Sequence, residues 1–203
     1  MTRNARRFVI IALAALFAGA AAAEVLSVTS TAGVTIAANG TTRTDVTVGN
    51  DYGGVEYRGL IQFSLPAFAG EVVSASLRLC KREEAAIYNY INIGVYRVTR
   101  AWDPNTVSWT QAESGVNWTG AGGDVASPAV DSVYVGADNT WYTWDVTAAV
   151  RHWRQHPAEN YGLQVKDGWR WIFFDGNDYR GGAYSPALTI EYSPPSGTVI
   201  VVR

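Results

Sequence analysis

The run Trp169-Arg170-Trp171-Ile172-Phe173-Phe174 combines residue types that bind sugars, because aromatic rings stack on sugar faces and arginine binds their oxygens. Side chains on a strand alternate between its two faces, so Trp169, Trp171 and Phe173 are predicted to share one side. A strand of a β-sandwich turns only one face toward the core. Unless a helix or loop covers the other face, one set of these side chains is exposed, and an exposed apolar strip indicates a binding surface.

Arginines elsewhere in the chain supply the charge that an acidic glycan needs, since a guanidinium forms paired hydrogen bonds with a carboxylate. Arg97 belongs to this group, although each arginine is also a common salt-bridge partner on a protein surface. The loop after the aromatic run adds a further ring and a further cation. The predicted ligand-binding residues are Trp169, Trp171, Tyr179, Arg180, Arg58 and Arg43.

The loop Asp175–Gly182 is rich in oxygen donors, which are the ligands that Ca²⁺ prefers. Asp175, Asn177 and Asp178, together with backbone carbonyls, form the predicted calcium site. The full spacing of an EF-hand is missing. The alternative interpretation is a glycine-rich hairpin turn, which needs no ion.

The sequence contains little evidence for a catalytic site. His152 and His156 are four residues apart, a spacing that can hold a metal, but a third ligand and the glutamate of the H-E-x-x-H motif are absent. Glu83 and Glu84 are adjacent, so their carboxylates point apart in extended structure. The prediction is a protein without catalytic activity, with an enzyme built from dispersed residues as the open alternative.

The first 23 residues have the three parts of a secretory signal peptide. Three arginines precede the uncharged apolar run Phe8–Ala18, and Ala21-Ala22-Ala23 fits the cleavage motif. The apolar run is shorter than the roughly 20 residues that span a bilayer, which disfavours a membrane anchor. Cleavage after Ala23 leaves Glu24 as the N-terminus of a secreted, extracellular or cell-surface protein with no membrane span.

The charge of the chain argues against nucleic acid as a partner. The sequence has 16 basic and 18 acidic residues, and removal of the signal takes three arginines and no acid. The secreted chain then has 13 basic residues against 18 acidic ones, a formal net charge of −5. Nucleic-acid binding depends instead on clustered lysine and arginine.

Cys80 is the single cysteine, so no intramolecular disulfide can form, and it is predicted to be a small buried side chain.

Short alternating segments separated by glycine, asparagine, aspartate or proline predict an all-β fold, a jelly-roll-type antiparallel β-sandwich. One short helix is predicted over Ala148–Arg154, with Thr147 or Asp145 as its N-cap and Pro157 as its stop. The predicted strands are Thr44–Val48, Leu60–Leu65, Ser74–Leu79, Ile91–Val98, Val133–Val135, Trp141–Val146, Gly162–Val165, Trp169–Phe174 and Ala187–Tyr192.

Several motifs occur in an order that resembles a known family. The segment Arg58-Gly59-Leu60-Ile61-Gln62-Phe63-Ser64-Leu65-Pro66 precedes Val73–Leu79. Trp102-Asp103-Pro104-Asn105-Thr106-Val107-Ser108-Trp109 follows, and then come Trp144-Asp145-Val146-Thr147 and Pro186–Tyr192. The chain is similar in this order to the DNRLRE-domain family, which is related to disaggregatase-associated domains and to a family of carbohydrate-binding modules.

The resemblance extends over Val34–Tyr192 and implies a secreted jelly-roll sandwich. Modules of this kind often sit beside polysaccharide lyases or hydrolases, and some relatives bind acidic polysaccharides such as alginate. No catalytic domain accompanies the module in this chain. Trp102, Trp109 and Trp144 within the motifs are expected to be scaffold residues that fill the sandwich.

The predicted organisation is a signal peptide over residues 1–23, one domain over residues 24–193 and a tail over residues 194–203. The leading hypothesis is a secreted, non-catalytic module that binds an extracellular polysaccharide, with anionic polysaccharides among the candidates. The tail is apolar and β-prone after Pro194-Pro195, so it can pair with another molecule. The alternatives are therefore a structural cell-surface, matrix or filament protein that self-associates through this strand, and a polysaccharide-degrading enzyme.

Overall fold

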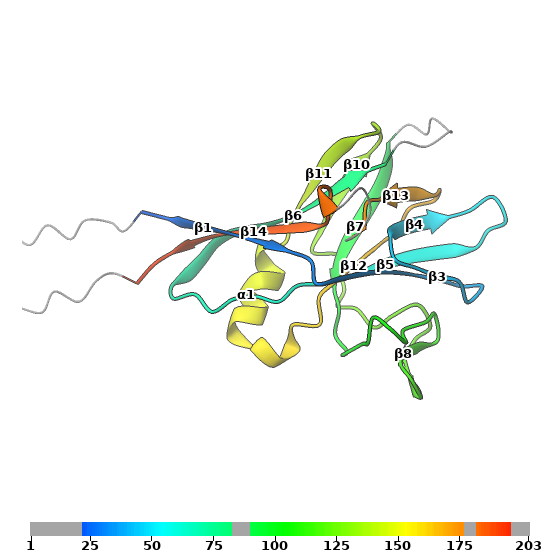
Figure 1. The fold of residues 1–203 in the computed structure, drawn as a ribbon, viewed down its shortest axis with the longest axis horizontal. Coiled ribbons are helices and arrows are strands. Elements are labelled where there is room, and N and C mark those ends of the chain that lie inside the picture. The colour runs from blue at the N-terminus through cyan, green and yellow to red at the C-terminus, as the bar shows by residue number, and fades with distance from the viewer. Residues whose placement is uncertain (1–21, 83–89, 177–181, 196–203) are drawn as a thin grey trace, which may run out of the picture.

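The computed structural model describes residues 22–82, 90–176 and 182–195, and these residues form an antiparallel β-sandwich (Figure 1). One sheet contains β1 (Glu24–Thr29), β14 (Ala187–Ser193), β6 (Glu71–Lys81), β11 (Thr140–Asp145), β13 (Ile172–Phe174) and β4 (Val46–Asn50). The other contains β2 (Ala32–Ala37), β3 (Thr42–Arg43), β5 (Glu56–Gln62), β12 (Leu163–Lys166), β7 (Ile91–Arg97) and β10 (Asp131–Val135). A separate hairpin pairs β8 (Gln111–Glu113) with β9 (Val116–Asn117).

The two sheets are joined through β4, which pairs with β13 of the first sheet and with β5 of the second. All strand pairs within the described residues are antiparallel. The predicted fold class, an all-β antiparallel sandwich with one short helix, is confirmed. Strands β1, β2, β3, β8 and β9 were not predicted, and β3 and β9 are only two residues long.

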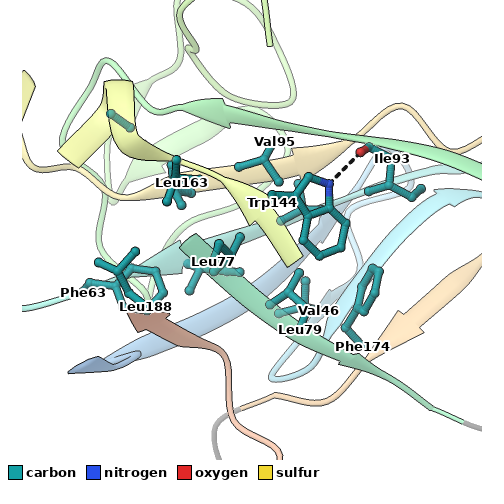
Figure 2. Close-up of a cluster of buried hydrophobic side chains, with 14 of the residues drawn as sticks. Val46, Phe63, Leu77, Leu79, Ile93, Val95, Trp144, Leu163, Phe174 and Leu188 are labelled. Atoms are coloured by element: carbon teal, nitrogen blue, oxygen red, sulfur yellow. Dashed lines mark hydrogen bonds between the residues drawn. The ribbon is translucent and has the colours of Figure 1, made fainter. Parts of the chain in front are cut away.

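The core lies between the sheets and is organised around Trp144 of β11 (Figure 2). This side chain is fully buried, and its indole N–H donates to the carbonyl of Ile93 on β7 at 2.9 Å. Its ring meets Phe174 edge-on at 5.8 Å. Trp144 therefore joins three strands from both sheets, which confirms its predicted inward orientation.

A second hydrophobic cluster covers the outer face of the second sheet. Trp102 and Trp118, from the segment between β7 and β10, are both buried there beside Leu60. The indole N–H of Trp102 donates to the carbonyl of Tyr161 at 2.8 Å, which ties the segment to the sheet. Trp109 packs against the same cluster, so the scaffold roles predicted for Trp102 and Trp109 are confirmed.

The helix α1 (Thr147–Gln155) buries Ala149, Val150 and Trp153 on one face. The predicted N-cap is wrong, because Val146 occupies the N-cap position and makes no side-chain cap bond. Asp145 still accepts the backbone N–H of Thr147 at 2.9 Å. The helix ends as predicted before Pro157, which opens the 3₁₀ turn η1 (Pro157–Glu159). No helix among the described residues is long and apolar enough to span a membrane.

Replacing Asp145 by alanine removes its hydrogen bond with the backbone N–H of Thr147 and is expected to lower the free energy of unfolding by about 1 kcal/mol at neutral pH. Hydrogen bonds from the Thr147 side chain and backbone hold the pKa of Asp145 below its ordinary 3.8. Its stabilisation is therefore present above pH 3.8 and lost as the pH falls through the lowered pKa.

The free energy of unfolding of Asp145→Ala, measured in urea, should differ from that of wild type at neutral pH and converge with it in acid. Asp145→Asn retains an acceptor and serves as the control, and a difference between Asp145→Ala and wild type that persists in acid would contradict the proposed role.

Candidate functional site

The aromatic run 169–174 lies at the end of the first sheet where β3, β4, β5 and β13 come together (Figure 1). Ile172 and Phe174 are buried in the core, whereas Trp171 and Phe173 are partly exposed on the opposite face. Only Ile172–Phe174 is a strand, because the chain bends at Trp169 and Arg170. The predicted alternation of faces is thus found over a shorter strand than predicted.

Arg43 of β3 stands over a group of three aromatic rings. The carbon of its guanidinium is 5.8 Å from the ring centre of Tyr57, 6.0 Å from that of Trp171 and 5.9 Å from that of Phe173. The ring of Trp171 lies 5.4 Å from each of the other two rings. We call these four residues the Arg43 cluster.

The charge of Arg43 is not neutralised within the part of the chain that the structure describes. None of these residues forms an ion pair or a hydrogen bond with its guanidinium, which is held by cation–π contacts alone. Burial and the carboxylate of Asp51 raise the pKa of Tyr57. The nearby cation of Arg43 acts to lower it. Arg43 therefore offers a partly buried positive charge with open N–H donors.

Arg82 borders the Arg43 cluster but differs from it electrostatically. Its guanidinium lies 5.1 Å from the Phe173 ring and forms an ion pair with Asp45 at 2.8 Å. The same carboxylate accepts the hydroxyl of Thr47 at 2.9 Å. Arg82 is thus held by an acidic partner, whereas Arg43 within the cluster is available to a ligand.

A neighbouring group extends the surface toward the turn between β4 and β5. The guanidinium carbon of Arg170 is 4.9 Å from the ring of Tyr52 and 5.4 Å from that of Trp169. Both rings are well exposed, Tyr52 at 72% and Trp169 at 60%. Gly49 of β4 allows this arrangement, because a Cβ atom there would lie only 2.0 Å from the carbonyl oxygen of Arg170.

Two of the predicted arginines lie elsewhere and have partners of their own. Arg58 bonds the carboxylate of Glu56 at 2.7 Å and the carbonyl of Gly122 at 3.0 Å, and it stacks on Trp109 at 4.8 Å. It thereby supports the second cluster on the other sheet. Arg97 lies 4.0 Å from Glu159.

Part of the predicted site falls outside the described residues. This holds for Tyr179 and Arg180 of the ligand set and for Asn177 and Asp178 of the calcium set. Asp175 is fully buried, and its backbone N–H donates to the carbonyl of Cys80 at 3.0 Å. Calcium binding therefore stays a prediction.

No group of three or more histidine, cysteine, aspartate or glutamate side chains within residues 22–82, 90–176 and 182–195 is arranged to hold a metal. The rings of His152 in α1 and of His156 at its C-cap are 4.8 Å apart and tilted by 41°, and Nε2 of His152 lies 2.8 Å from the carboxylate of Glu159. The hydrogen bond with His152 lowers the pKa of Glu159. The histidine pair thus contacts an acidic neighbour on η1.

The structure adds Tyr57 and Arg82 to the site, and sequence reasoning had missed both. Arg82 is two residues beyond Cys80 and four beyond Arg78, on the strand face opposite Leu77 and Leu79. This period of two was a usable signal. Tyr57 carries no comparable signal, because it is 4% exposed and reads as an ordinary core residue.

The outward surface presents aromatic ring faces and cationic hydrogen-bond donors on a rigid antiparallel sandwich. Sugar-binding modules use these groups to bind their ligands. The comparison with known families agrees with this class. The chain belongs to carbohydrate-binding module family 96, whose family model matches residues 28–168. The predicted relation to carbohydrate-binding modules is thereby confirmed.

The matched segment includes Arg43, Tyr57 and Arg82 and ends one residue before Trp169. The rings of Trp169, Trp171 and Phe173 therefore lie beyond it. No curated protein matches the chain.

Proposed function

We propose that this protein is a secreted, non-catalytic module that binds an anionic extracellular polysaccharide through the Arg43 cluster. The observation that carries the proposal is the guanidinium of Arg43, which three rings hold in place and no described acidic group neutralises. Arginine presents a planar fork of donors that matches a carboxylate. Partial burial strengthens such a pair relative to one in bulk water.

The rings beside Arg43 complete the recognition of a sugar acid. Trp171 and Phe173 are partly exposed on the same face, so a sugar ring can pack on them while its carboxylate meets Arg43. The indole nitrogen of Trp171 is buried and has no hydrogen-bond partner among the described residues, so this ring contributes apolar contact rather than a donor. A neutral sugar satisfies the rings but leaves the cation unpaired, which favours a uronate.

Export is supported by the signal-like sequence of residues 1–23 and by the position of β1, which begins at Glu24, the first residue after the predicted cleavage site. A non-catalytic role is supported by the family and by the lack of a catalytic motif in the sequence. The narrower name, DNRLRE domain, is part of the proposal. Self-association through residues 196–203 and polysaccharide degradation stay alternative predictions, and residues 196–203 lie outside the described chain.

The proposal predicts that Arg43→Gln weakens binding to alginate or polygalacturonate about tenfold, as expected when a hydrogen-bonded charge pair is lost. Affinity electrophoresis or calorimetry with the purified protein measures this. Arg154→Gln is the matched control, because Arg154 also stacks on a ring, Phe68 at 5.1 Å, but lies on α1 at the other end of the molecule (Figure 1). Trp169→Ala and Trp171→Ala should also reduce retention on the immobilised polysaccharide.

Equal affinity of Arg43→Gln and wild type, or equal binding of wild type to neutral glucans, would contradict the proposal. Repeating the measurement with a chelator tests calcium independently of Arg43. A glycan array then names the sugar.

A further inference from the structure

A second arginine–aromatic group lies on the first sheet, outside the Arg43 cluster. Arg78 of β6 is exposed, and its guanidinium carbon lies 4.8 Å from the ring of Trp141 on β11. Trp141 in turn stacks on Tyr184, with ring centres 6.1 Å apart and planes 24° apart. We call these three residues the Arg78 cluster.

Arg78 resembles Arg43 in its electrostatics. No ion pair or hydrogen bond joins its guanidinium to any residue among those that the structure describes, so the stack on Trp141 is its defined contact. Arg82, between the two clusters, is paired with Asp45. The face therefore carries two available cations, separated by a neutralised one.

The strand register places both clusters on the same face of the sheet. In β6, Leu77 and Leu79 point into the core, so Arg78 and the covered Cys80 lie on the opposite face, and Arg82 follows directly after the strand. Cys80 is directly opposite Trp141 in β11, and directly opposite residues share a face. On the other edge, the backbone N–H of Arg82 donates to the carbonyl of Phe173, whose ring contacts the Arg82 side chain.

The two clusters therefore lie on one face of three neighbouring strands, β13, β6 and β11, as two separate patches, because Cys80 between Arg78 and Arg82 is 1% exposed. Arg82 follows β6 directly and is four residues beyond Arg78, which corresponds to about 13 Å of extended chain. A single sugar that contacts the Arg43 cluster is too small to reach the Arg78 cluster as well. A polymer chain laid across β6 can contact both.

We propose that the Arg78 cluster is a second carboxylate subsite, and that the two clusters together bind an internal stretch of a polyuronate chain. The inference rests on the proposed function and adds to it a second group of residues that contacts the polysaccharide. Two cations, each beside aromatic rings and spaced along one face, match carboxylates that repeat along a polysaccharide. Simultaneous contact at two linked subsites raises affinity without any new type of contact.

The test compares uronic-acid disaccharides with long oligomers of the same acid, using wild type, Arg43→Gln, Arg78→Gln and the control Arg154→Gln. Wild type should bind long oligomers at least about tenfold more tightly than disaccharides. Arg78→Gln should lose most of that gain and keep the disaccharide affinity. Arg43→Gln should weaken both. Arg78 is exposed, so its replacement leaves the core intact, which circular dichroism checks.

The outcomes separate the two proposals. If wild type binds no uronate of any length, the proposed function is overturned. If wild type and Arg43→Gln differ but Arg78→Gln binds long oligomers as wild type does, only the second subsite is overturned. Equal binding of single-stranded DNA and long oligomers would overturn the polyuronate as the ligand class, because rings and cations can also bind nucleic acid.

Discussion

Gly49→Ala is expected to destabilise the fold and to weaken polysaccharide binding together, whereas Gly54→Ala should have a small effect on stability and none on binding. Gly49 has φ +88°, and a Cβ there would lie 2.0 Å from the carbonyl oxygen of Arg170 and 2.9 Å from that of Gly168. Both contacts are with backbone. The chain at residues 168–170 must therefore move, and it carries Trp169 and Trp171 with it.

The control separates backbone strain from collision. Gly54 has φ +80°, but a Cβ there meets nothing within 4 Å. Gly54→Ala should cost only the strain of a left-handed residue, about 1–2 kcal/mol. Gly49→Ala adds overpacking, about 1–3 kcal/mol more. Denaturant unfolding and binding to a uronate polymer measure both effects, and equal results for the two variants would show that the close approach at Gly49 does not position the site.

Trp144→Ala is expected to reduce the free energy of unfolding by about 3–5 kcal/mol, which is a large part of the total stability of a domain. The side chain fills the centre of the core, meets Phe174 edge-on and donates to the carbonyl of Ile93 at 2.9 Å. Its loss leaves a cavity and an unpaired buried carbonyl together. Trp144→Phe retains much of the volume and keeps the experiment measurable if the alanine variant does not fold.

Trp169→Ala is the matched control for Trp144, because Trp169 is 60% exposed. It should change stability by about 0.5 kcal/mol or less, as most surface substitutions do. It should nevertheless weaken polysaccharide binding. Guanidinium chloride unfolding followed by tryptophan fluorescence distinguishes the two variants, and a similar loss of stability in both would contradict the assignment of Trp169 to the surface.

The sequence by itself determined features that depend on local periodicity. The alternation within residues 171–174 placed Trp171 and Phe173 opposite Ile172 and Phe174, and the structure agrees. The inward orientation of Trp144 and the stop at Pro157 were predictable for the same reason, since strand alternation and proline geometry act over a few residues. The helix start was not, because Val146 took the N-cap position that Thr147 or Asp145 was expected to hold.

The tertiary structure alone decided which arginines form the site. Arg43 and Arg58 are both arginines on short strand segments, and nothing in their local sequence distinguishes them. In the fold, Arg58 meets Glu56 and the carbonyl of Gly122, whereas Arg43 stands over three rings from β5 and β13. The pair of Arg58 with Glu56 is local, but the contacts of Arg58 with Gly122 and of Arg43 with the rings depend on how distant segments pack together, which follows from burial of the whole core rather than from local residue preferences.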